Sequence, residues 1–378
     1  MDSRIYWIWL QQALGAGSSW AEPLLIAFHT PEGVYAAPPE ELAKRVPGTV
    51  CRRLKDRSLE GAKEILRRTV AEGDWLITPA DEAYPALLRG IHSPPLVLYG
   101  RGTMPDFSTH PSLAVVGTRR LTAYGRRVTD LLVRELTAGG ALIVTGVAEG
   151  GDAAAIRAAL EAGGTPVALL PCGLDLSYPL ATLPLRRQIP EAGGALLTEY
   201  PYGVRVGKGA FHTRNRLISG LALGVCVTEA PLGSGALITA SCAKEQGRDV
   251  YAVPGDLTSP ASAGTNELIK AGARLLVSAG EVLAEYGHLF PSEGKETGSL
   301  AAQPKPLIPA REAETVRLPQ TLSDGARALY RQLETEPCPV DDIAARAGLT
   351  VSGALALLTE LELYSLVSCT AGQQYYRV

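Results

Sequence analysis

The feature that most constrains the fold is an alternation of short apolar runs with helical patterns between about residues 113 and 286. The runs are rich in Val, Ile and Leu and lie at residues 113–116, 141–145, 167–170, 195–198, 225–228, 250–253 and 275–277. Helical patterns, for example at 124–138, 153–162 and 237–246, separate most of them. Strands that are apolar on both faces and alternate with helices form parallel sheets covered on both sides. The central region is therefore predicted to be an α/β domain built on a Rossmann-like parallel sheet.

The first of these strands leads into a positively charged turn. Four residues suited to a ligand-binding turn follow the strand: Gly117, Thr118, Arg119 and Arg120. A helix is expected from near residue 122, so the turn lies at the carboxyl edge of the sheet, beside a helix N-terminus. Ligands bind at that edge of open α/β sheets, and helix N-termini favour phosphate. A dinucleotide site would have a glycine where Arg119 stands, and we therefore expect this turn to bind a polyanion instead.

A second cluster of cations lies about ninety residues further along the chain. It combines basic side chains with an aromatic ring and an amide, and contains no acid: Lys208, Phe211, Arg214, Asn215 and Arg216. Cations that follow a phosphate backbone, together with a ring on which a base can stack, are typical of single-stranded nucleic-acid binding. The alternative is a solvated basic loop whose Phe211 enters the core.

A glycine-rich turn at residues 233–235 follows another apolar run and precedes a helix. The N–H groups around Ser234 and Gly235, with the Ser234 hydroxyl, suit a phosphate. The same residues also suit a tight turn in which Ser234 caps the helix. Both interpretations stay open from the sequence.

Composition limits the classes of protein that fit. The chain has 378 residues, 46% of them hydrophobic and 20% charged, and a net charge of −3. It is long enough for two or three globular domains with sizeable cores, but nucleic-acid binding must use a local strip of charge. Neither an 18-residue apolar run nor a signal-peptide pattern is found, so we expect a cytoplasmic protein without a membrane partner. The six cysteines form no C-x-x-C motif, and neither a disulfide framework nor a metal site is predicted.

The two ends of the chain differ from the centre. Residues 1–75 are predicted to form a helical domain, with helices at 4–14, 23–28, 39–45 and 58–72, and residues 76–289 the Rossmann-like domain. Residues 290–319 have the composition of a flexible linker. Residues 320–378 are predicted to form a winged helix from helices at 323–334, 340–347 and 351–362 and strands at 367–370 and 374–378. The helix at 351–362 contains no Lys or Arg, which a DNA-reading helix needs for phosphate contacts.

From about residue 75 to residue 286 the sequence resembles the DNA-processing protein A (DprA, or Smf) family of bacteria. The segments that carry the resemblance include Val-Gly-Thr-Arg at 116–119, Thr-Glu-Tyr-Pro at 198–201, Arg-Asn-Arg-Leu-Ile-Ser-Gly-Leu at 214–221 and Gly-Arg-Asp-Val-Tyr-Ala-Val-Pro-Gly at 247–255. The resemblance implies an extended Rossmann domain, a sterile-alpha-motif-like helical domain before it and a winged helix after it.

The resemblance also implies a protein that needs no cofactor and catalyses no reaction. Family members bind single-stranded DNA, form homodimers and load the RecA recombinase onto strands coated with single-strand-binding protein, which protects incoming strands in natural transformation. The residues that match the family's single-strand pocket are Gly117, Thr118, Arg119, Lys208, Phe211, Arg214, Asn215 and Arg216. Thr118 replaces the usual serine, His212 replaces a proline, and Ile156 stands where the family has a histidine.

A second class of function fits the same fold. Nucleotide-binding or nucleotide-hydrolysing enzymes of the lysine-decarboxylase-like type have a Rossmann sheet with glycine-rich turns at this edge. Their Pro-Gly-Gly-x-Gly-Thr motif is absent, and residues 231–236 resemble it only distantly. Glu199 and Glu229 end neighbouring strands and could mimic an acid/base pair, but we expect them to orient arginines among Arg119, Arg214 and Arg216.

Overall fold

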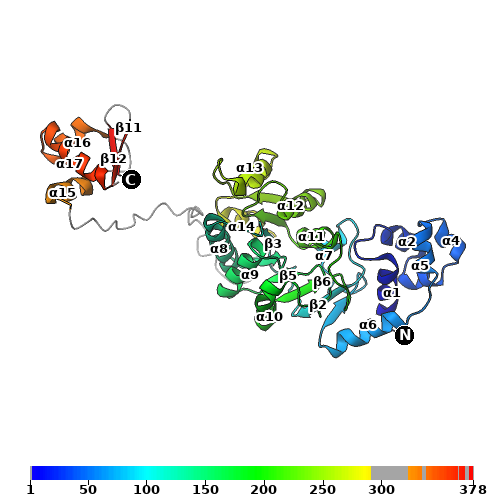
Figure 1. Ribbon diagram of the computed structural model, residues 1–378. Coiled ribbons are helices and arrows are strands. Elements are labelled where there is room, and N and C mark those ends of the chain that lie inside the picture. Colours follow the sequence, from blue (N-terminus) through cyan, green and yellow to red (C-terminus); the bar gives the residue numbers. More distant parts are fainter. Residues whose placement is uncertain (1, 291–321, 334–337, 365, 371–373, 378) are drawn as a thin grey trace. The chain divides into compact units, whose positions relative to one another are not determined.

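The computed structural model describes residues 2–290, 322–333, 338–364, 366–370 and 374–377. The chain divides into two compact units, Met1–Pro309 and Ala310–Val378 (Figure 1). The predicted linker at 290–319 lies outside the described residues, apart from its first residue.

The N-terminal part of the first unit is a group of short helices. Their bounds are α1 (Arg4–Leu14), α2 (Ala21–Phe28), α3 (Pro31–Ala36), α4 (Pro39–Ala43), α5 (Gly48–Leu54) and α6 (Glu60–Ala71). The sequence patterns predicted α1, α2, α4 and α6 but not α3 or α5. Both missed helices are short and begin next to a proline, Pro31 at the start of α3 and Pro47 just before α5. Proline suits the first turn of a helix, but in a sequence it equally signals a loop.

A nine-stranded sheet follows, in the order β1-β2-β6-β5-β4-β3-β7-β8-β9. The strands are β1 (Trp75–Ile77), β2 (Leu98–Gly102), β3 (Ser112–Val116), β4 (Leu142–Thr145), β5 (Val167–Leu169), β6 (Ala195–Thr198), β7 (Gly224–Val227), β8 (Asp249–Ala252) and β9 (Arg274–Leu275). All pairings from β6 to β9 are parallel, which confirms the predicted sheet. Strands β1 and β2 add an antiparallel edge; a strand at residues 96–99 was predicted, but β1 and the antiparallel pairing were not. Strand order reverses at β3, between β4 and β7, and ligands bind at such a point in open α/β sheets.

Helices cover both faces of this sheet. They are α7 (Ala86–Arg89), α8 (Ala123–Ala138), α9 (Gly151–Glu161), α10 (Leu183–Glu191), α11 (Ala210–Gly220), α12 (Gly235–Glu245), α13 (Ala263–Lys270) and α14 (Ala279–Gly287), with 3-10 turns at Leu180–Thr182 and Pro260–Ser262. Successive residues of β3 enter different cores, because side chains of a strand alternate between its faces. Leu113 and Val115 pack with α8, α9 and α14, whereas Ala114 and Val116 pack with α11 and α12.

The N-terminal helices share a core with one end of the sheet. Ile8 and Leu10 of α1 belong to the same buried cluster as Tyr99 of β2 and Leu196 of β6. In Figure 1 these helices lie beside the end of the sheet that carries β2 and β6. The two parts therefore form one compact unit, and a domain boundary at residue 75 stays a prediction from the sequence.

The second unit is a small winged helix, as predicted. It contains α15 (Asp324–Gln332), α16 (Val340–Ala347) and α17 (Val351–Leu363), and a sheet of β10 (Cys338–Pro339), β12 (Gln374–Arg377) and β11 (Val367–Thr370), in that order. Within the described residues no single helix is long and apolar enough to cross a membrane. The bent pair Val340–Ala347 and Val351–Glu362 passes that test only jointly, by length and composition.

Candidate nucleic-acid interface

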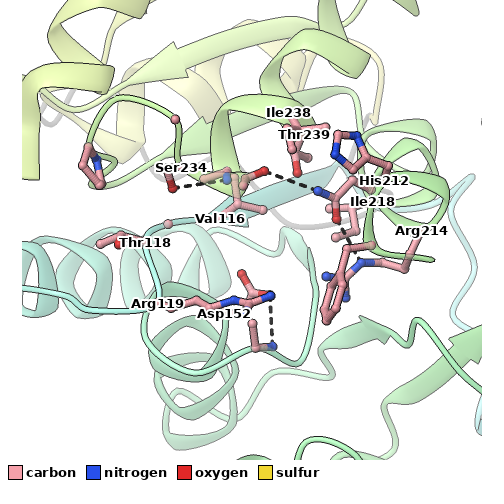
Figure 2. Close-up of a pocket in the computed structure, with 18 of the residues that line it drawn as sticks. Val116, Thr118, Arg119, Asp152, His212, Arg214, Ile218, Ser234, Ile238 and Thr239 are labelled. Carbon is pink, nitrogen blue, oxygen red and sulfur yellow. Dashed lines mark hydrogen bonds between the residues drawn. The ribbon is translucent and has the colours of Figure 1, made fainter. Parts of the chain in front are cut away.

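A cavity of about 460 Å³ opens at the carboxyl ends of β3 and β7, where the strand order reverses. Most of its lining comes from three segments far apart in the sequence: the turn at 116–120, residues 211–218 of α11, and the turn and helix start at 231–239. Ala148 and Asp152 complete the lining. Figure 2 shows side chains of all three segments around this cavity, including Arg119, Arg214 and Ser234. The turn after β3, the basic cluster and the glycine-rich turn predicted from the sequence thus meet at one place.

The turn after β3 is held by a buried carboxylate. Glu229, 1% exposed, accepts hydrogen bonds from Thr122 N at 2.8 Å and from Thr122 Oγ1 at 2.6 Å. Its backbone oxygen accepts from Thr118 N at 2.7 Å. The anion position at the N-terminus of α8, where phosphate was expected, is therefore occupied by Glu229 itself. The guanidiniums of Arg119 and Arg120, which are exposed, remain available to a polyanion.

Glycines allow a second loop to pack directly against this turn. Gly151 N donates to Thr118 O at 2.9 Å, and a Cβ on Gly151 would lie 2.5 Å from the Cα of Gly117. Gly150 has φ +78°, and a Cβ there would lie 2.2 Å from Thr118 O. The loop at residues 150–151 thus fixes the shape of the turn after β3 through its backbone.

Phe211 lies in the first turn of α11, with cations on its ring. The Arg119 guanidinium carbon lies 4.9 Å from the ring centroid and that of Arg214 lies 5.9 Å away. Tyr178 meets the same ring edge-on, at 6.2 Å between centroids. The side chain is half-buried and lines the cavity. Phe211 is therefore not part of a solvated loop, because its segment is helical. It is not a core residue either, because its ring is half-buried at the cavity.

Arg214 contributes to the cavity from a buried position. Its Nη1 donates to Leu169 O at 2.6 Å and its Nε to Asn215 Oδ1 at 3.0 Å, and only 4% of the residue is exposed. Asp152 of α9 lies near Arg214, on the other side of Gly146. A Cβ on Gly146 would touch both side chains. Burial lowers the pKa of Arg214 and raises the pKa of Asp152, and their mutual attraction opposes both shifts. Asn215 Nδ2 donates to Gly235 O at 3.3 Å and so joins α11 to α12.

Two of the predicted cations do not line the cavity. Arg216 forms a buried ion pair with Glu199, with side-chain exposures of 13% and 4%. The expectation that Glu199 orients an arginine is thereby confirmed for Arg216, whereas Glu229 binds the turn after β3 instead. Lys208 is exposed in the segment just before α11.

The N-terminus of α12 opens onto the cavity. Ser234 is its N-cap, and its Oγ accepts from Ala236 N at a long 3.4 Å. Ser234 and Gly235 both line the cavity, and Leu232 next to them is 67% exposed. Both roles considered for Ser234 are thus compatible with its position, since a weakly capped helix N-terminus can still bind an anion.

Several lining residues were not anticipated from the sequence. They are Asp152, His212, Ile218, Leu232, Ile238 and Thr239, among others. Ile218 lies seven residues after Phe211, on the same face of α11. Helical periodicity would have identified it, had residues 210–220 been recognised as a helix rather than a basic segment.

The sequence matches models of known protein families. The family model for DNA recombination-mediator protein A matches residues 75–287, and that for the DprA winged helix domain matches residues 313–373. Protein Smf from Synechocystis sp. is 33% identical over 396 residues, which cover 100% of this chain and 99% of that protein.

Two solved structures are similar as well. DNA processing protein A from Streptococcus pneumoniae has 31% identity and a TM-score of 0.65, over 74% of this chain and 97% of that one. A structure that addresses the single-stranded DNA binding mode of DNA processing protein A from Helicobacter pylori has 32% identity and a TM-score of 0.50, over 56% of this chain and 94% of that one. With a matching family model over more than half of its length and a full-length relative, the chain belongs to the DNA recombination-mediator protein A (DprA/Smf) family.

Proposed function

We propose that this protein binds single-stranded DNA in the cavity at the ends of β3 and β7, with little sequence preference. The observation that carries the proposal is the half-buried Phe211 ring, which lies in a cavity beside the guanidiniums of Arg119 and Arg214. An aromatic face and cations together suit unpaired bases and their phosphates, whatever the sequence. Stacking needs a base that has left the duplex, so single strands bind more tightly than duplex.

The proposed role of each site residue depends on whether its side chain is exposed or buried. Arg119, Arg120 and Lys208 are exposed and contact phosphates, and the N-terminus of α12, with the Ser234 hydroxyl and Gly235, binds one more. Gly117 and Thr118 shape the turn that carries the two arginines. Arg214 and Asn215 form the buried wall behind Phe211, and Arg216 supports that wall through Glu199. The Helicobacter pylori relative, whose structure addresses a single-stranded DNA binding mode, supports single-stranded DNA as the ligand.

The proposed biological role is that of a recombination mediator rather than an enzyme. We infer that the protein acts in the cytoplasm as a homodimer, protects incoming single strands in natural transformation and loads RecA onto strands coated with single-strand-binding protein. A single cavity with a few exposed cations gives modest affinity at physiological salt. Two linked cavities on one strand bind more tightly because the second contact is intramolecular.

The binding proposal is tested by competition. A labelled oligonucleotide is bound to the protein, and unlabelled single strands, blunt duplex and free mononucleotides are added in turn. We expect single strands to compete best, duplex weakly and mononucleotides hardly at all. Equal competition by duplex would contradict the proposal. Strong competition by a mononucleotide that is then hydrolysed would support the lysine-decarboxylase-like alternative.

The mediator proposal needs a separate experiment. ATP hydrolysis by RecA from the same organism is followed on single strands coated with single-strand-binding protein, with and without this protein. We expect the protein to shorten the delay before hydrolysis begins. If the delay is unchanged although the strands are bound, the protein is a DNA-binding protein with a different purpose.

A further inference from the structure

The N-terminal helices contact Glu199, the residue that follows β6, at two points. Gln11 of α1 is 3% exposed, and its Nε2 donates to Glu199 O at 3.0 Å and to Val97 O at 2.9 Å. In the loop after α1, Gly17 N donates to Glu199 Oε1 at 2.9 Å. Both the backbone and the carboxylate of Glu199 are thus held by the first seventeen residues.

The same carboxylate continues the connection to α11. Glu199 Oε2 pairs with Arg216 Nη2, and only 4% and 13% of the two side chains is exposed. A charge-assisted pair at a buried position fixes the geometry of both partners more firmly than a surface pair. Since the N–H of Gly17 and Arg216 bind different oxygens of one carboxylate, the loop and the helix are joined through Glu199.

The loop also touches α11 directly. Gly17 has φ +68°, and a Cβ at this position would lie 2.8 Å from Thr213 Cγ2 and 3.4 Å from Arg216 Nε. A separation under 3.0 Å requires one of the two groups to move. The backbone of Gly17 therefore fits against Thr213 with no space for a side chain. Gly15, two residues earlier, also has positive φ (+86°) but has nothing within 4 Å of an added Cβ.

Helix α11 is therefore held by the N-terminal loop through Thr213 and Arg216 and lines the cavity with Phe211, Arg214 and Asn215. We propose that the loop at residues 15–18, acting through Glu199 and Arg216, positions α11 for strand binding. The N-terminal helices are then a positioning element for a site to which they contribute no lining residue. The inference rests on the proposed function, because it assigns a cause to the geometry of the single-strand cavity.

Alanine at position 17 tests the contact, and position 15 supplies its control. Gly17→Ala adds both backbone strain and the clash with Thr213, whereas Gly15→Ala adds strain in the same loop without a clash. We expect Gly17→Ala to weaken oligonucleotide binding by about 5-fold or more, the lower end of common coupling between sites. Gly15→Ala should bind nearly as the wild type does.

A second-site variant makes the test specific. The double variant with Gly17→Ala and Thr213→Ser lacks the Cγ2 methyl that the new Cβ would meet, so it should regain most of the lost affinity. Thr213→Ser alone is the reference for the double variant. If Gly17→Ala binds like the wild type, or if the double variant stays as weak as the single one, the loop does not position α11.

Hydrogen exchange tests this inference separately from the proposed function. The first of two measurements compares Gly17→Ala with the wild type and uses no oligonucleotide. In Gly17→Ala, amides of residues 210–220 should exchange faster than in the wild type while amides of β3 and β7 do not change. Unchanged exchange in α11 would overturn the inference even if the wild type binds DNA. Failure of the wild type to bind single strands would overturn the proposed function alone, since exchange in α11 still decides the positioning role.

The second hydrogen-exchange measurement compares the wild-type protein with and without an oligonucleotide. It can therefore be made even if the variants do not fold. Coupling between two sites is reciprocal, so an oligonucleotide in the cavity should slow exchange in the segment that contains the Gly17 amide. A bound oligonucleotide that leaves this segment unchanged would contradict the proposal.

Discussion

At the scale of residues, burial divides the cations of the site into two kinds. Arg119, Arg120 and Lys208 are exposed, whereas Arg214 and Arg216 are enclosed by the protein. An exposed cation that neutralises a phosphate releases a counterion from the strand, and that release makes binding depend on salt. A buried cation that is already paired has no such contribution. Removal of an exposed cation should therefore change the salt dependence of binding, whereas removal of a buried one should not.

The salt dependence of binding should identify the phosphate contacts. Arg120→Ala and Lys208→Ala should each weaken binding and lower the slope of log K against log salt by about 0.7, the value for one contact to a single strand. Arg187→Ala is the control, because Arg187 is exposed on α10 and does not line the cavity. An unchanged slope in both test variants would show that the exposed cations do not bind phosphate.

Loss of stacking on Phe211 should lower the affinity without changing its salt dependence. Phe211→Ala should cost about 1–3 kcal/mol of binding free energy, because it removes the ring, while the salt slope stays nearly constant. Phe211→Tyr keeps an aromatic face and should bind like the wild type. Titrations with one oligonucleotide at several salt concentrations give both quantities. Loss of slope without loss of affinity at low salt would assign the ring to holding Arg119 instead.

The meeting of the aromatic ring and the cations could be predicted from the sequence, but the burial of two of the cations could not. Phe211 and Arg119 were expected to act together, and they meet in the cavity. Nothing in the segment 214–216 distinguishes its arginines from exposed ones. Their surroundings come from Asp152, Glu199 and Gly17, which the fold brings together from distant parts of the chain.

At the scale of elements, the central apolar strands were predictable because both of their faces are buried. Strands β3 to β8 lie within one or two residues of their predicted bounds. Strand β1, which pairs antiparallel with β2, was missed; unlike β5, which has the same length, it is fully buried only at its middle residue. Helix α11 was missed because its polar residues resemble a loop, although Arg214 and Asn215 are buried.

Glu229 at the N-terminus of α8 provides a test at this scale. Glu229→Gln replaces a charged acceptor of two hydrogen bonds by an amide with one acceptor oxygen, so the free energy of unfolding should fall by about 1–3 kcal/mol. Glu281→Gln is the control, since Glu281 is an exposed acid in the first turn of α14, where the effect is about 0.3–1 kcal/mol. Denaturant titration measures both. Equal losses in the two variants would mean that Glu229 has no special role in holding the turn.

At the scale of the whole molecule, the two ends of the chain relate differently to the site. The N-terminal helices share a core with the sheet and contact α11. The winged helix forms a separate compact unit. Its helix α17, which would be the DNA-reading helix of a winged helix domain, has no Lys or Arg between Val351 and Leu363. We therefore expect the N-terminal helices and the winged helix to differ in their importance for single-strand binding.

Truncation after residue 290 should accordingly leave single-strand binding within about twofold of the wild type, a difference of less than 0.5 kcal/mol. The remaining unit keeps its sheet, its cavity and the N-terminal loop that holds α11, and the removed unit offers no cation on α17 for phosphate. Anisotropy titrations of the full chain and the truncated chain with one oligonucleotide measure the difference, with light scattering to compare their oligomeric states. A large loss of affinity at unchanged oligomeric state would show that the winged helix contacts DNA through residues outside α17. A loss accompanied by dissociation of a dimer would instead assign the second unit to assembly, since two cavities on one strand bind more tightly than one.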